Sequence, residues 1–366
     1  MRVLFVSKPV VPPWNDGSKN LVRDVASHLV RARPTVMVSP GAAPLGGGIV
    51  EEAVYGETGT FAPSASANAR VLARLMFGDP LDVWHFVFAP NPASSAAAWM
   101  AIRSRRARGW KGKVVQTIAS VPRSFRGVGR LLFGDVVVAQ SEHTRARLVE
   151  HGVAPALLRV VAPCAEAPRV CKPAELAEAR RACGLEGDGP IVLYPGDYEV
   201  STGASTVVAA ARAIARELPD ARVVLACRRK TPRAERIEAE LRESARDLGG
   251  LVRFLGDVPD MHALLTLADV VAMPVDDLYG KVDVPLVVIE ALALGKPLVL
   301  SSGGPLQSVH TASFVAPAEP QALAAACISA LRGQARESAL EGARLYAERF
   351  SPAVVAAAYD EIYREP

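Results

Sequence analysis

The chain has 366 residues, of which 50% are hydrophobic and 22% are charged, and its formal net charge at pH 7 is +4. This length is enough for two domains of ordinary size, and the composition excludes an intrinsically disordered protein. The small net charge argues against a dedicated nucleic-acid-binding protein, and no segment approaches the 18 apolar residues that predict a membrane span.

The cysteines favour a reducing compartment. Cys164, Cys171, Cys183, Cys227 and Cys327 are odd in number, scattered, and form no C-x-x-C pair. They are typical of reduced thiols in a cytosolic protein. The apolar run at residues 1–7 is too short for a signal peptide and predicts a first strand, so we expect a cytoplasmic protein.

The first half of the chain alternates short β-branched runs with helical patterns, which is typical of an open parallel sheet. Strands are predicted at residues 2–6, 35–38, 83–86, 113–117, 135–139 and 159–162. Helices are predicted at residues 17–30, 67–77, 92–106 and 142–151. Prolines and small residues at 163–168 break this rhythm and indicate a linker.

The same alternation restarts after the linker. Strands are predicted at residues 191–194, 222–226, 251–254, 269–272, 298–300 and 314–315, and helices at 204–217, 232–248, 260–267, 285–294 and 321–331. The chain therefore predicts two Rossmann-like α/β domains, at residues 1–165 and 166–350. Ligands bind such sheets beyond the carboxyl ends of the strands, and the cleft between the two domains is the expected site.

Residues 351–366 predict a terminal helix that crosses back to the first domain. Ser351 and Pro352 are favourable residues for a helix start. An apolar stripe at helical spacing comprises Val354, Val355, Ala358 and Ile362, with Tyr359 beside it. A short helix with such a stripe needs a surface on which to bury it.

Two loops of the first domain carry candidate site residues. The first strand is followed by Trp14, Asn15, Asp16 and Gly17, where a glycine lets a sugar or phosphate approach the backbone. The alternative is a helix cap on a surface loop. His85 lies at the end of a later strand and is either a catalytic residue or a satisfied core histidine.

Two loops of the second domain are candidates for holding a diphosphate. The loop with Gly196, Thr202 and Gly203 can wrap a diphosphate with backbone N–H groups, although it matches neither G-x-G-x-x-G nor the P-loop pattern. Arg228, Arg229 and Lys230 follow the next strand and suit a pyrophosphate. The alternative for this second loop is a solvated basic turn.

Glu290 is the most informative single residue of the chain. It lies in an apolar helix that follows an acidic, Pro-containing loop and ends at Gly295. The N-terminus of a helix attracts phosphate, and a carboxylate in apolar surroundings needs partners such as the two hydroxyls of a ribose. The alternative is an ordinary buried helix whose glutamate is favoured by the helix dipole.

Several short motifs follow one another in a fixed order. Ser141 lies in a strand-end turn, and later come residues 253–258, 261–265, 268–270 and 273–274, then Glu290-Ala291, Ala293, Gly295 and Pro297. Residues 347–351, Tyr359 and Tyr363 stand at the end of the chain. In this order and spacing, the motifs resemble those of the retaining GT-B glycosyltransferases, and of family 4 most of all.

The sequence departs from the family pattern at charged positions. The family usually has a second glutamate eight residues before Glu290, where this chain has Val282, and Asp283 is the nearest carboxylate. Asp197 and Thr202 stand where the family has an arginine and a lysine that neutralise the donor diphosphate. Two interpretations are open, a divergent subfamily and a loss of catalysis.

The resemblance implies a GT-B fold and the transfer of a sugar from a nucleotide-sugar donor, UDP-sugar in our prediction, to an acceptor hydroxyl. It implies retention at the anomeric carbon, no metal and no cofactor. The implied catalytic residues are His85 and Asp283, and the implied acceptor-binding residues are Trp14, Asn15, Asp16, Phe86 and Asn91. The implied donor-binding residues are Gly17, Gly196, Thr202, Gly203, Arg228, Lys230, Lys281, Val284, Pro285 and Glu290.

Several partners and activities remain open on the sequence alone. The expected acceptor is a small molecule, a glycan or a lipid-linked sugar, and no nucleic-acid partner is expected. The mixture of arginines and apolar residues at 123–133 indicates either a contact with the inner face of a membrane or a basic segment with a buried side. A catalytically inactive nucleotide-sugar-binding subunit and a GT-B epimerase are the alternative functions.

Overall fold

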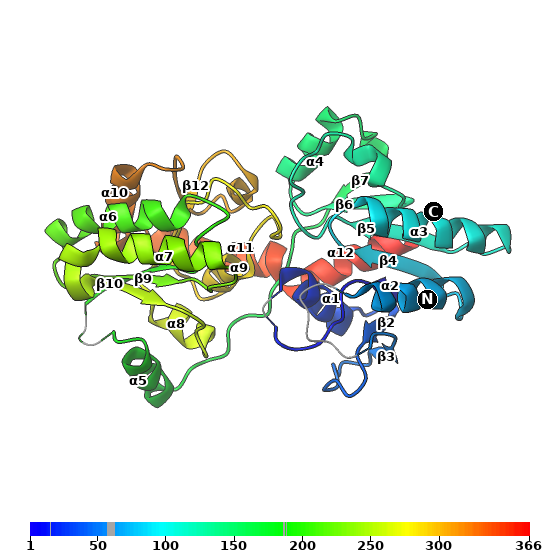
Figure 1. The fold of residues 1–366 in the computed structure, drawn as a ribbon, viewed down its shortest axis with the longest axis horizontal. Coiled ribbons are helices and arrows are strands. Elements are labelled where there is room, and N and C mark those ends of the chain that lie inside the picture. The colour runs from blue at the N-terminus through cyan, green and yellow to red at the C-terminus, as the bar shows by residue number, and fades with distance from the viewer. Residues whose placement is uncertain (15, 57–62, 186, 188) are drawn as a thin grey trace. The chain divides into compact units, whose positions relative to one another are not determined.

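A computed structural model describes residues 1–14, 16–56, 63–185, 187 and 189–366 (Figure 1). The chain forms two compact units. Unit 1 comprises Met1–Glu166, Tyr279–Leu286 and Arg349–Pro366, and unit 2 comprises Ala167–Leu278 and Val287–Glu348. The boundary between Glu166 and Ala167 falls within the proline-containing segment, whereas Tyr279–Leu286 belongs to unit 1 although the sequence placed it in the second domain.

Unit 1 is built on a parallel sheet whose strand order is β3-β2-β1-β4-β5-β6-β7. In the central register, Val3 of β1 lies between Pro34 of β2 and Val83 of β4. The strands are β1 (Arg2–Val6), β2 (Arg33–Val38), β3 (Val50–Ala53), β4 (Val83–Val87), β5 (Lys113–Thr117), β6 (Val136–Ala139) and β7 (Leu158–Val160). The helices are α1 (Gly17–His28), α2 (Ala65–Phe77), α3 (Pro92–Ala107), α4 (Glu142–Glu150) and α12 (Pro352–Arg364), with short 3-10 turns η1 (Val128–Leu131) and η2 (Pro155–Leu157).

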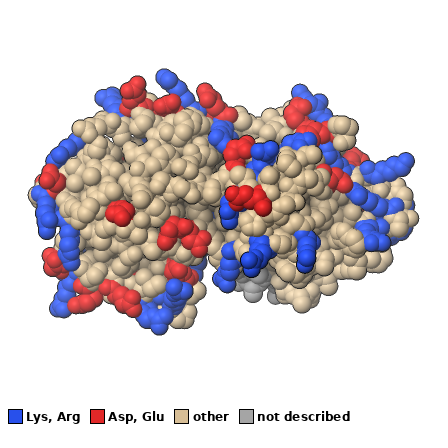
Figure 2. Space-filling model, turned by 90° about the horizontal axis from the view of Figure 1, so that it is seen from above, with Lys and Arg blue, Asp and Glu red and all other residues tan. Residues whose placement is uncertain are grey.

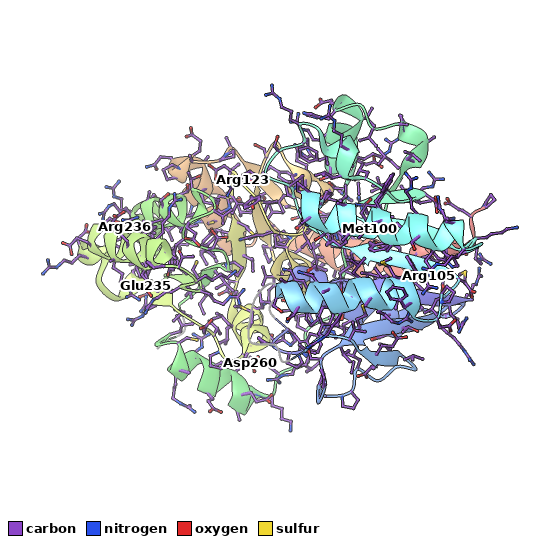
Figure 3. All side chains as sticks on the ribbon, turned by 45° about the vertical axis from the view of Figure 1, so that its right-hand side comes forward. Met100, Arg105, Arg123, Glu235, Arg236 and Asp260 are labelled. Carbon is purple, nitrogen blue, oxygen red and sulfur yellow. The ribbon has the colours of Figure 1, made fainter. Side chains whose placement is uncertain are left out.

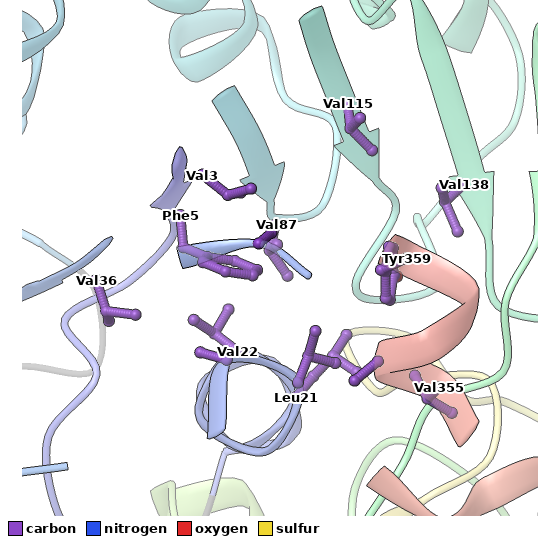
Figure 4. Close-up of a cluster of buried hydrophobic side chains, with 14 of the residues drawn as sticks. Val3, Phe5, Leu21, Val22, Val36, Val87, Val115, Val138, Val355 and Tyr359 are labelled. Carbon is purple, nitrogen blue, oxygen red and sulfur yellow. The ribbon is translucent and has the colours of Figure 1, made fainter. Parts of the chain in front are cut away.

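Helices cover both faces of this sheet because successive strand residues point to opposite sides. Val3 and Phe5 of β1 face a core that includes residues of α1 and α12 (Figure 4). Leu4 and Val6 of the same strand face a second core that includes residues of α2 and α3. The apolar runs that predicted the strands are thus buried on both sides.

Helix α12 packs on unit 1. Its residues Val355 and Tyr359 are 1% and 0% exposed, and both belong to the core beside α1. The Asp360 carboxylate accepts hydrogen bonds of 3.0 Å from the backbone N–H groups of Val30 and Arg31, just beyond the end of α1. Val354, which the predicted stripe included, is 40% exposed, so the buried face is turned slightly from the predicted one.

Unit 2 has a second parallel sheet, in the order β10-β9-β8-β11-β12-β13. Its strands are β8 (Ile191–Tyr194), β9 (Arg222–Ala226), β10 (Val252–Leu255), β11 (Val270–Met273), β12 (Leu298–Ser301) and β13 (Ser313–Val315). Its helices are α5 (Pro173–Ala182), α6 (Gly203–Glu217), α7 (Pro232–Ser244), α8 (Met261–Leu267), α9 (Leu286–Ala293), α10 (Pro320–Leu331) and α11 (Arg336–Leu345). The turns η3 (Arg246–Leu251), η4 (Pro305–Ser308) and η5 (Tyr346–Phe350) complete the described elements.

The predicted α/β class with two Rossmann-like halves is confirmed, and the differences lie at the periphery. The sequence missed β3, α5 and α11. Strand β3 is an edge strand whose sequence is VEEA, and charged residues suit an exposed edge but hide the apolar strand pattern. Helix α5 buries none of its residues, so it has no apolar stripe that reveals it.

Candidate functional site

The predicted site residues fall in both units, and each group is described within its own unit. Gly196, Thr202, Gly203, Arg228, Lys230 and Glu290 belong to unit 2. Trp14, Asp16, Gly17, His85, Phe86, Asn91, Lys281, Asp283, Val284 and Pro285 belong to unit 1. Asn15, which the sequence predicted as an acceptor-binding residue, lies outside the described residues.

The loop between β8 and α6 is wrapped around the ring of Tyr194. The Tyr194 hydroxyl donates a 3.1 Å hydrogen bond to the Asp197 carbonyl. A Cβ on Gly196 would overlap the Tyr194 ring, and a Cβ on Gly203 would lie 2.6 Å from its hydroxyl oxygen. Both positions therefore require glycine for packing on Tyr194, a reason that the sequence does not reveal.

The topological switch point of unit 2 lies between β8 and β11. Strand β8 pairs with β9 on one side and with β11 on the other, so the loops that follow β8 and β11 diverge there. A hydrogen bond of 2.8 Å joins them, from the backbone N–H of Thr202 to the Asp276 carboxylate. Asp276 is therefore a charged residue at this position that the sequence reasoning missed.

One residue of the basic loop after β9, Arg229, forms a structural ion pair. The Arg229 guanidinium contacts the Glu238 carboxylate of α7 through Nε at 2.5 Å and Nη2 at 2.9 Å. Arg242 contacts the same carboxylate at 2.7 Å. Burial alone would raise the pKa of Glu238, but these two arginines hold it below its usual value. Arg228 and Lys230 flank this pair and remain candidates for a diphosphate.

Glu290 lies in the second turn of α9 with its side chain 16% exposed. Its Oε1 atom is 3.9 Å from Nε2 of His262 on α8, whose side chain is 38% exposed. A partly exposed carboxylate on an otherwise apolar helix can accept hydrogen bonds from a ligand. His262 is a neighbour that the sequence reasoning did not single out, because α8 and α9 are separated by a strand and a long loop.

In unit 1, the segment Tyr279–Leu286 is held against the loop that follows β5. Val121 and Tyr279 form a parallel bridge, and the Val121 N–H donates a 2.8 Å hydrogen bond to the Lys281 carbonyl. The side chain of Val282 packs at Gly17, where an added Cβ would lie 3.0 Å from Val282 Cγ1. Gly17 thus makes room for Val282, and its contact with a sugar or phosphate stays a prediction.

Asp283 is the buried anchor of this segment. The residue is 1% exposed, and its carboxylate accepts a hydrogen bond from the hydroxyl of Ser141, the N-cap of α4. Burial raises the pKa of Asp283, and the Ser141 hydrogen bond opposes this effect in part. Its neighbour Val284 is completely buried. These contacts give Asp283 a positioning role within unit 1, which differs from the predicted direct contact with a sugar.

His85 is an interior residue of unit 1. It is 1% exposed, its Nδ1 lies 2.7 Å from the Tyr363 hydroxyl, and its Nε2 lies 2.7 Å from Thr117 Oγ1. Burial lowers the pKa of His85 to about 3. An imidazole with both nitrogens engaged in the core is not presented to a substrate, so the core-histidine alternative describes this geometry better than the catalytic one.

The buried imidazole gives unit 1 a specific pH dependence. The folded pKa of about 3 is below the unfolded value of about 6.5, so only the unfolded chain takes up this proton between those values. Stability is therefore lost as the pH falls below 6.5. Between pH 7 and pH 5 the free energy of unfolding should decrease by about 2 kcal/mol because of His85. The measurement is urea denaturation of the wild type and of His85→Gln at both pH values.

The matched control is the exposed His310, replaced by glutamine. We expect the pH-dependent loss to become smaller in His85→Gln and to stay unchanged in His310→Gln. An equal loss in all three proteins would contradict a neutral His85 in the folded core.

The predicted acceptor-binding residues differ in how accessible they are. Trp14 is 36% exposed, and the Arg23 guanidinium lies 4.6 Å from its ring centroid. Asp16 is the N-cap of α1 and pairs with Lys8 at 2.8 Å. Asn91 is the N-cap of α3. Phe86 is 1% exposed, so its predicted contact with an acceptor is not available in this fold.

The comparisons with known proteins identify the class. Residues 189–333 match the family "Glycosyl transferases group 1". A phosphatidyl-myo-inositol mannosyltransferase of Mycolicibacterium smegmatis is 32% identical over 139 residues, and this match spans 37% of the chain and 33% of that relative. Unit 2 thus contains most of the region that carries the family signature.

Solved structures extend the similarity to the whole chain in fold. A glycosyltransferase from Rickettsia africae has a TM-score of 0.75 at 17% identity, with 99% of this chain and 97% of that chain covered. HepE of Anabaena, solved in complex with UDP and glucose, has a TM-score of 0.73 at 19% identity, with both chains fully covered. Sucrose-phosphate synthase from Thermosynechococcus elongatus has a TM-score of 0.74 at 21% identity, with 100% and 98% covered.

These matches confirm the predicted resemblance: the chain has the GT-B fold and carries a glycosyl transferases group 1 domain. They support the predicted enzyme class, a glycosyltransferase. Within the described residues, no helix combines the length and the apolar character that crossing a membrane requires.

Proposed function

We propose that the protein is a metal-independent, retaining glycosyltransferase of family 4 type that transfers a sugar from a UDP-sugar to an acceptor hydroxyl on a glycan or a lipid-linked sugar. The observation that carries the proposal is Glu290, a partly exposed carboxylate on α9 inside the matched glycosyltransferase domain. UDP is the favoured nucleotide because HepE, which shares the fold, was solved with UDP and glucose.

The proposed reaction needs a site that accepts negative charge. As the bond between the anomeric carbon and the phosphate oxygen breaks, charge develops on the leaving diphosphate. The acceptor oxygen forms the new bond to the anomeric carbon, and its proton passes to the departing phosphate oxygen. In unit 2, Arg228, Lys230 and the N-terminus of α6 at Gly203 are the groups that we assign to this charge. Glu290 is assigned to the ribose hydroxyls.

A second candidate function is a nucleotide-sugar-binding subunit without appreciable catalysis. Three observations in unit 2 favour it. Asp197, 7% exposed, stands where the resemblance implies an arginine, and Thr202 stands where it implies a lysine. In addition, the Asp276 carboxylate accepts the hydrogen bond of the Thr202 N–H, a donor that a diphosphate would otherwise use.

A pair of assays separates these functions. Thermal unfolding is followed with UDP, GDP, ADP and TDP, where a ligand at about 100 times its Kd adds about 2.7 kcal/mol of stability. Release of the nucleoside diphosphate from the matching nucleotide-sugar is then measured with and without acceptors. Stabilisation by UDP together with diphosphate release supports the enzyme, and stabilisation without release supports the binding subunit. No stabilisation by any of the four nucleotides would contradict both functions.

A further inference from the structure

Asp24 is a buried carboxylate of unit 1 that the proposed reaction does not use. Acidic side chains usually lie at the surface, where Figure 2 shows many of them among Lys and Arg. Asp24, on α1, is instead 1% exposed. Its Oδ1 accepts a 2.6 Å hydrogen bond from Arg23 Nε, whereas its Oδ2 has no hydrogen-bond partner among the described residues. Burial of such a group disfavours its charged form.

The surroundings of Asp24 place its titration close to neutral pH. Burial raises the pKa of Asp24 to about 6, the Glu166 carboxylate adds to the increase, and Arg23 and His28 oppose it. The charged and titratable groups along this part of α1 are Arg23 and His28 of α1, Cys164 and Glu166 of the segment after β7, and Tyr359 and Asp360 of α12. Burial raises the pKa of Cys164 and of Tyr359, so both stay neutral in this range. Histidine is the other side chain that commonly titrates there, so His28 requires a control.

Two contacts connect Asp24 to the loop that follows β1. The Arg23 guanidinium, whose Nε binds Asp24, also lies 4.6 Å from the centroid of the Trp14 ring. Asn20, one turn before Asp24 on the same helix, donates a 3.2 Å hydrogen bond from Nδ2 to the Trp14 carbonyl. Trp14 is 36% exposed and the Arg23 side chain is 25% exposed. A stack of arginine on tryptophan at the surface is thus joined to a buried charge.

The charge on Asp24 is the main reason for Arg23 to stay on the ring. A cation–π contact near the surface is weak by itself, and holding an arginine in one conformation costs side-chain entropy. The hydrogen bond to an ionised carboxylate is stronger, because both partners are charged. When the carboxylate becomes neutral this attraction is lost, and water competes for the guanidinium.

We propose that Asp24, Arg23 and Trp14 form a proton-sensitive switch, in which the ionised carboxylate holds the guanidinium over the indole and a proton on Oδ2 releases it. At about pH 7.5 the carboxylate is charged and Arg23 covers Trp14, whereas at about pH 5 it is neutral and the guanidinium turns to solvent. We assign Asn20 Oδ1 as the acceptor of the new Oδ2–H. It is a buried oxygen one helical turn away, also without a hydrogen-bond partner among the described residues.

The switch acts on a loop that the sequence predicted to bind the acceptor. Trp14 follows β1 at the carboxyl end of the sheet, and an indole whose two faces are free presents a larger apolar surface to a ligand. Acid should therefore expose this surface, and neutral pH should shield it. The switch needs neither nucleotide nor sugar, so its test is independent of the proposed function.

The test is quenching of tryptophan fluorescence in the full chain by acrylamide, an uncharged quencher, between about pH 5 and 7.5. The chain has four tryptophans, Trp14, Trp84, Trp99 and Trp110. Trp14→Phe is measured in parallel, so that the difference from the wild type reports Trp14. Because release uncovers the second face of the ring, quenching of Trp14 should rise by up to about twofold as the pH falls, with a midpoint near 6.

Three variants test the assignment of this transition. Asp24→Asn keeps the size of the side chain but is neutral at every pH, so Trp14 should be as accessible at neutral pH as it is in the wild type in acid. Arg23→Gln removes the guanidinium and should also leave Trp14 accessible at every pH. His28→Gln should keep the transition of the wild type. Circular dichroism at both ends of the pH range verifies that the variants are folded.

The stack of Arg103 on Trp99 is the matched control. It lies on α3, where Figure 3 labels Met100 and Arg105. The Arg103 guanidinium is 4.5 Å from the centroid of the Trp99 ring, and within the described part of the chain no acidic residue forms an ion pair with it. The difference between the wild type and Trp99→Phe should therefore show the same quenching at both ends of the pH range.

Each other outcome overturns the proposal. A Trp14 signal that is constant with pH, or a transition that persists in Asp24→Asn, would show that Asp24 does not control the stack. Loss of the transition in His28→Gln would assign it to the imidazole. Equal transitions of Trp14 and Trp99 would indicate a general loosening of unit 1. If Asp24→Asn did not fold, Arg23→Gln would decide, since a pH transition retained in that variant contradicts the switch.

Discussion

Replacement of Tyr359 by alanine is expected to destabilise unit 1 by about 3–5 kcal/mol, the range typical for large aromatic residues in a core. Tyr359 is completely buried on α12. Its ring centroid lies 4.8 Å from that of His85, and its hydroxyl lies 3.0 Å from Thr117 Oγ1. Alanine would leave a cavity between α12 and the sheet and remove a partner from Thr117. The measurement is the free energy of unfolding in urea.

Two variants of the same helix serve as controls. Tyr359→Phe removes only the hydroxyl and should cost about 1 kcal/mol. Val354→Ala alters a residue that is 40% exposed, so its effect should stay within about 0.5 kcal/mol. If Tyr359→Ala were no more destabilising than Val354→Ala, α12 would not be part of the folded core of unit 1.

Strand positions were predictable because parallel strands that are buried on both faces form short, nearly continuous apolar runs. In β8 the run Ile191–Tyr194 is completely or almost completely buried, as its composition indicated. Helix α12 was predictable for a related reason, since its apolar stripe needed a surface. The edge strand β3 and the exposed helix α5 carry no such pattern, and local sequence alone does not reveal them.

The candidate site was less predictable because its features depend on pairings between distant residues. The sequence places Gly196 and Gly203 in a loop, but it does not show why glycine is required there. The requirement comes from the side chain of Tyr194, which a Cβ at either position would overlap. In the sequence, Arg229 is one cation of a basic loop. In the fold, α7 places the Glu238 carboxylate beside it, and the two form an ion pair. In the sequence, His85 is a residue near the end of a strand. In the fold, it is covered by α12, whose Tyr363 lies 278 positions later in the chain and contacts His85 through its hydroxyl.

The departures from the family pattern acquire a physical meaning in unit 2. The missing cations at Asp197 and Thr202 are not replaced by Arg229, because its guanidinium is bound to the buried Glu238. The proposed function assigns the diphosphate to Arg228 and Lys230 because of their position after β9. Since Asp276 adds a carboxylate at the Thr202 amide, nucleotide affinity should depend strongly on contacts outside the diphosphate.

Glu290→Gln is accordingly expected to weaken nucleotide binding by about 10- to 100-fold, equivalent to about 1.5–3 kcal/mol for a lost charge-assisted hydrogen bond. Glutamine keeps the size of the side chain, so α9 should stay folded. Because the proposed contact is to the ribose, uridine and UDP should lose affinity by the same factor. The measurement is isothermal titration calorimetry with both ligands.

Glu341→Gln is the matched control, since Glu341 is an exposed residue of α11 in the same unit. This variant should bind UDP as the wild type does. A structural role for Glu290 gives a different result. If its main function were to hold His262, the substitution would lower the thermal stability of unit 2 without changing the Kd. Unchanged affinity for UDP, GDP, ADP and TDP would remove Glu290 from the site. A gain in UDP affinity, with uridine weakened or unchanged, would instead place the carboxylate near the diphosphate, where its negative charge is unfavourable and its removal strengthens binding.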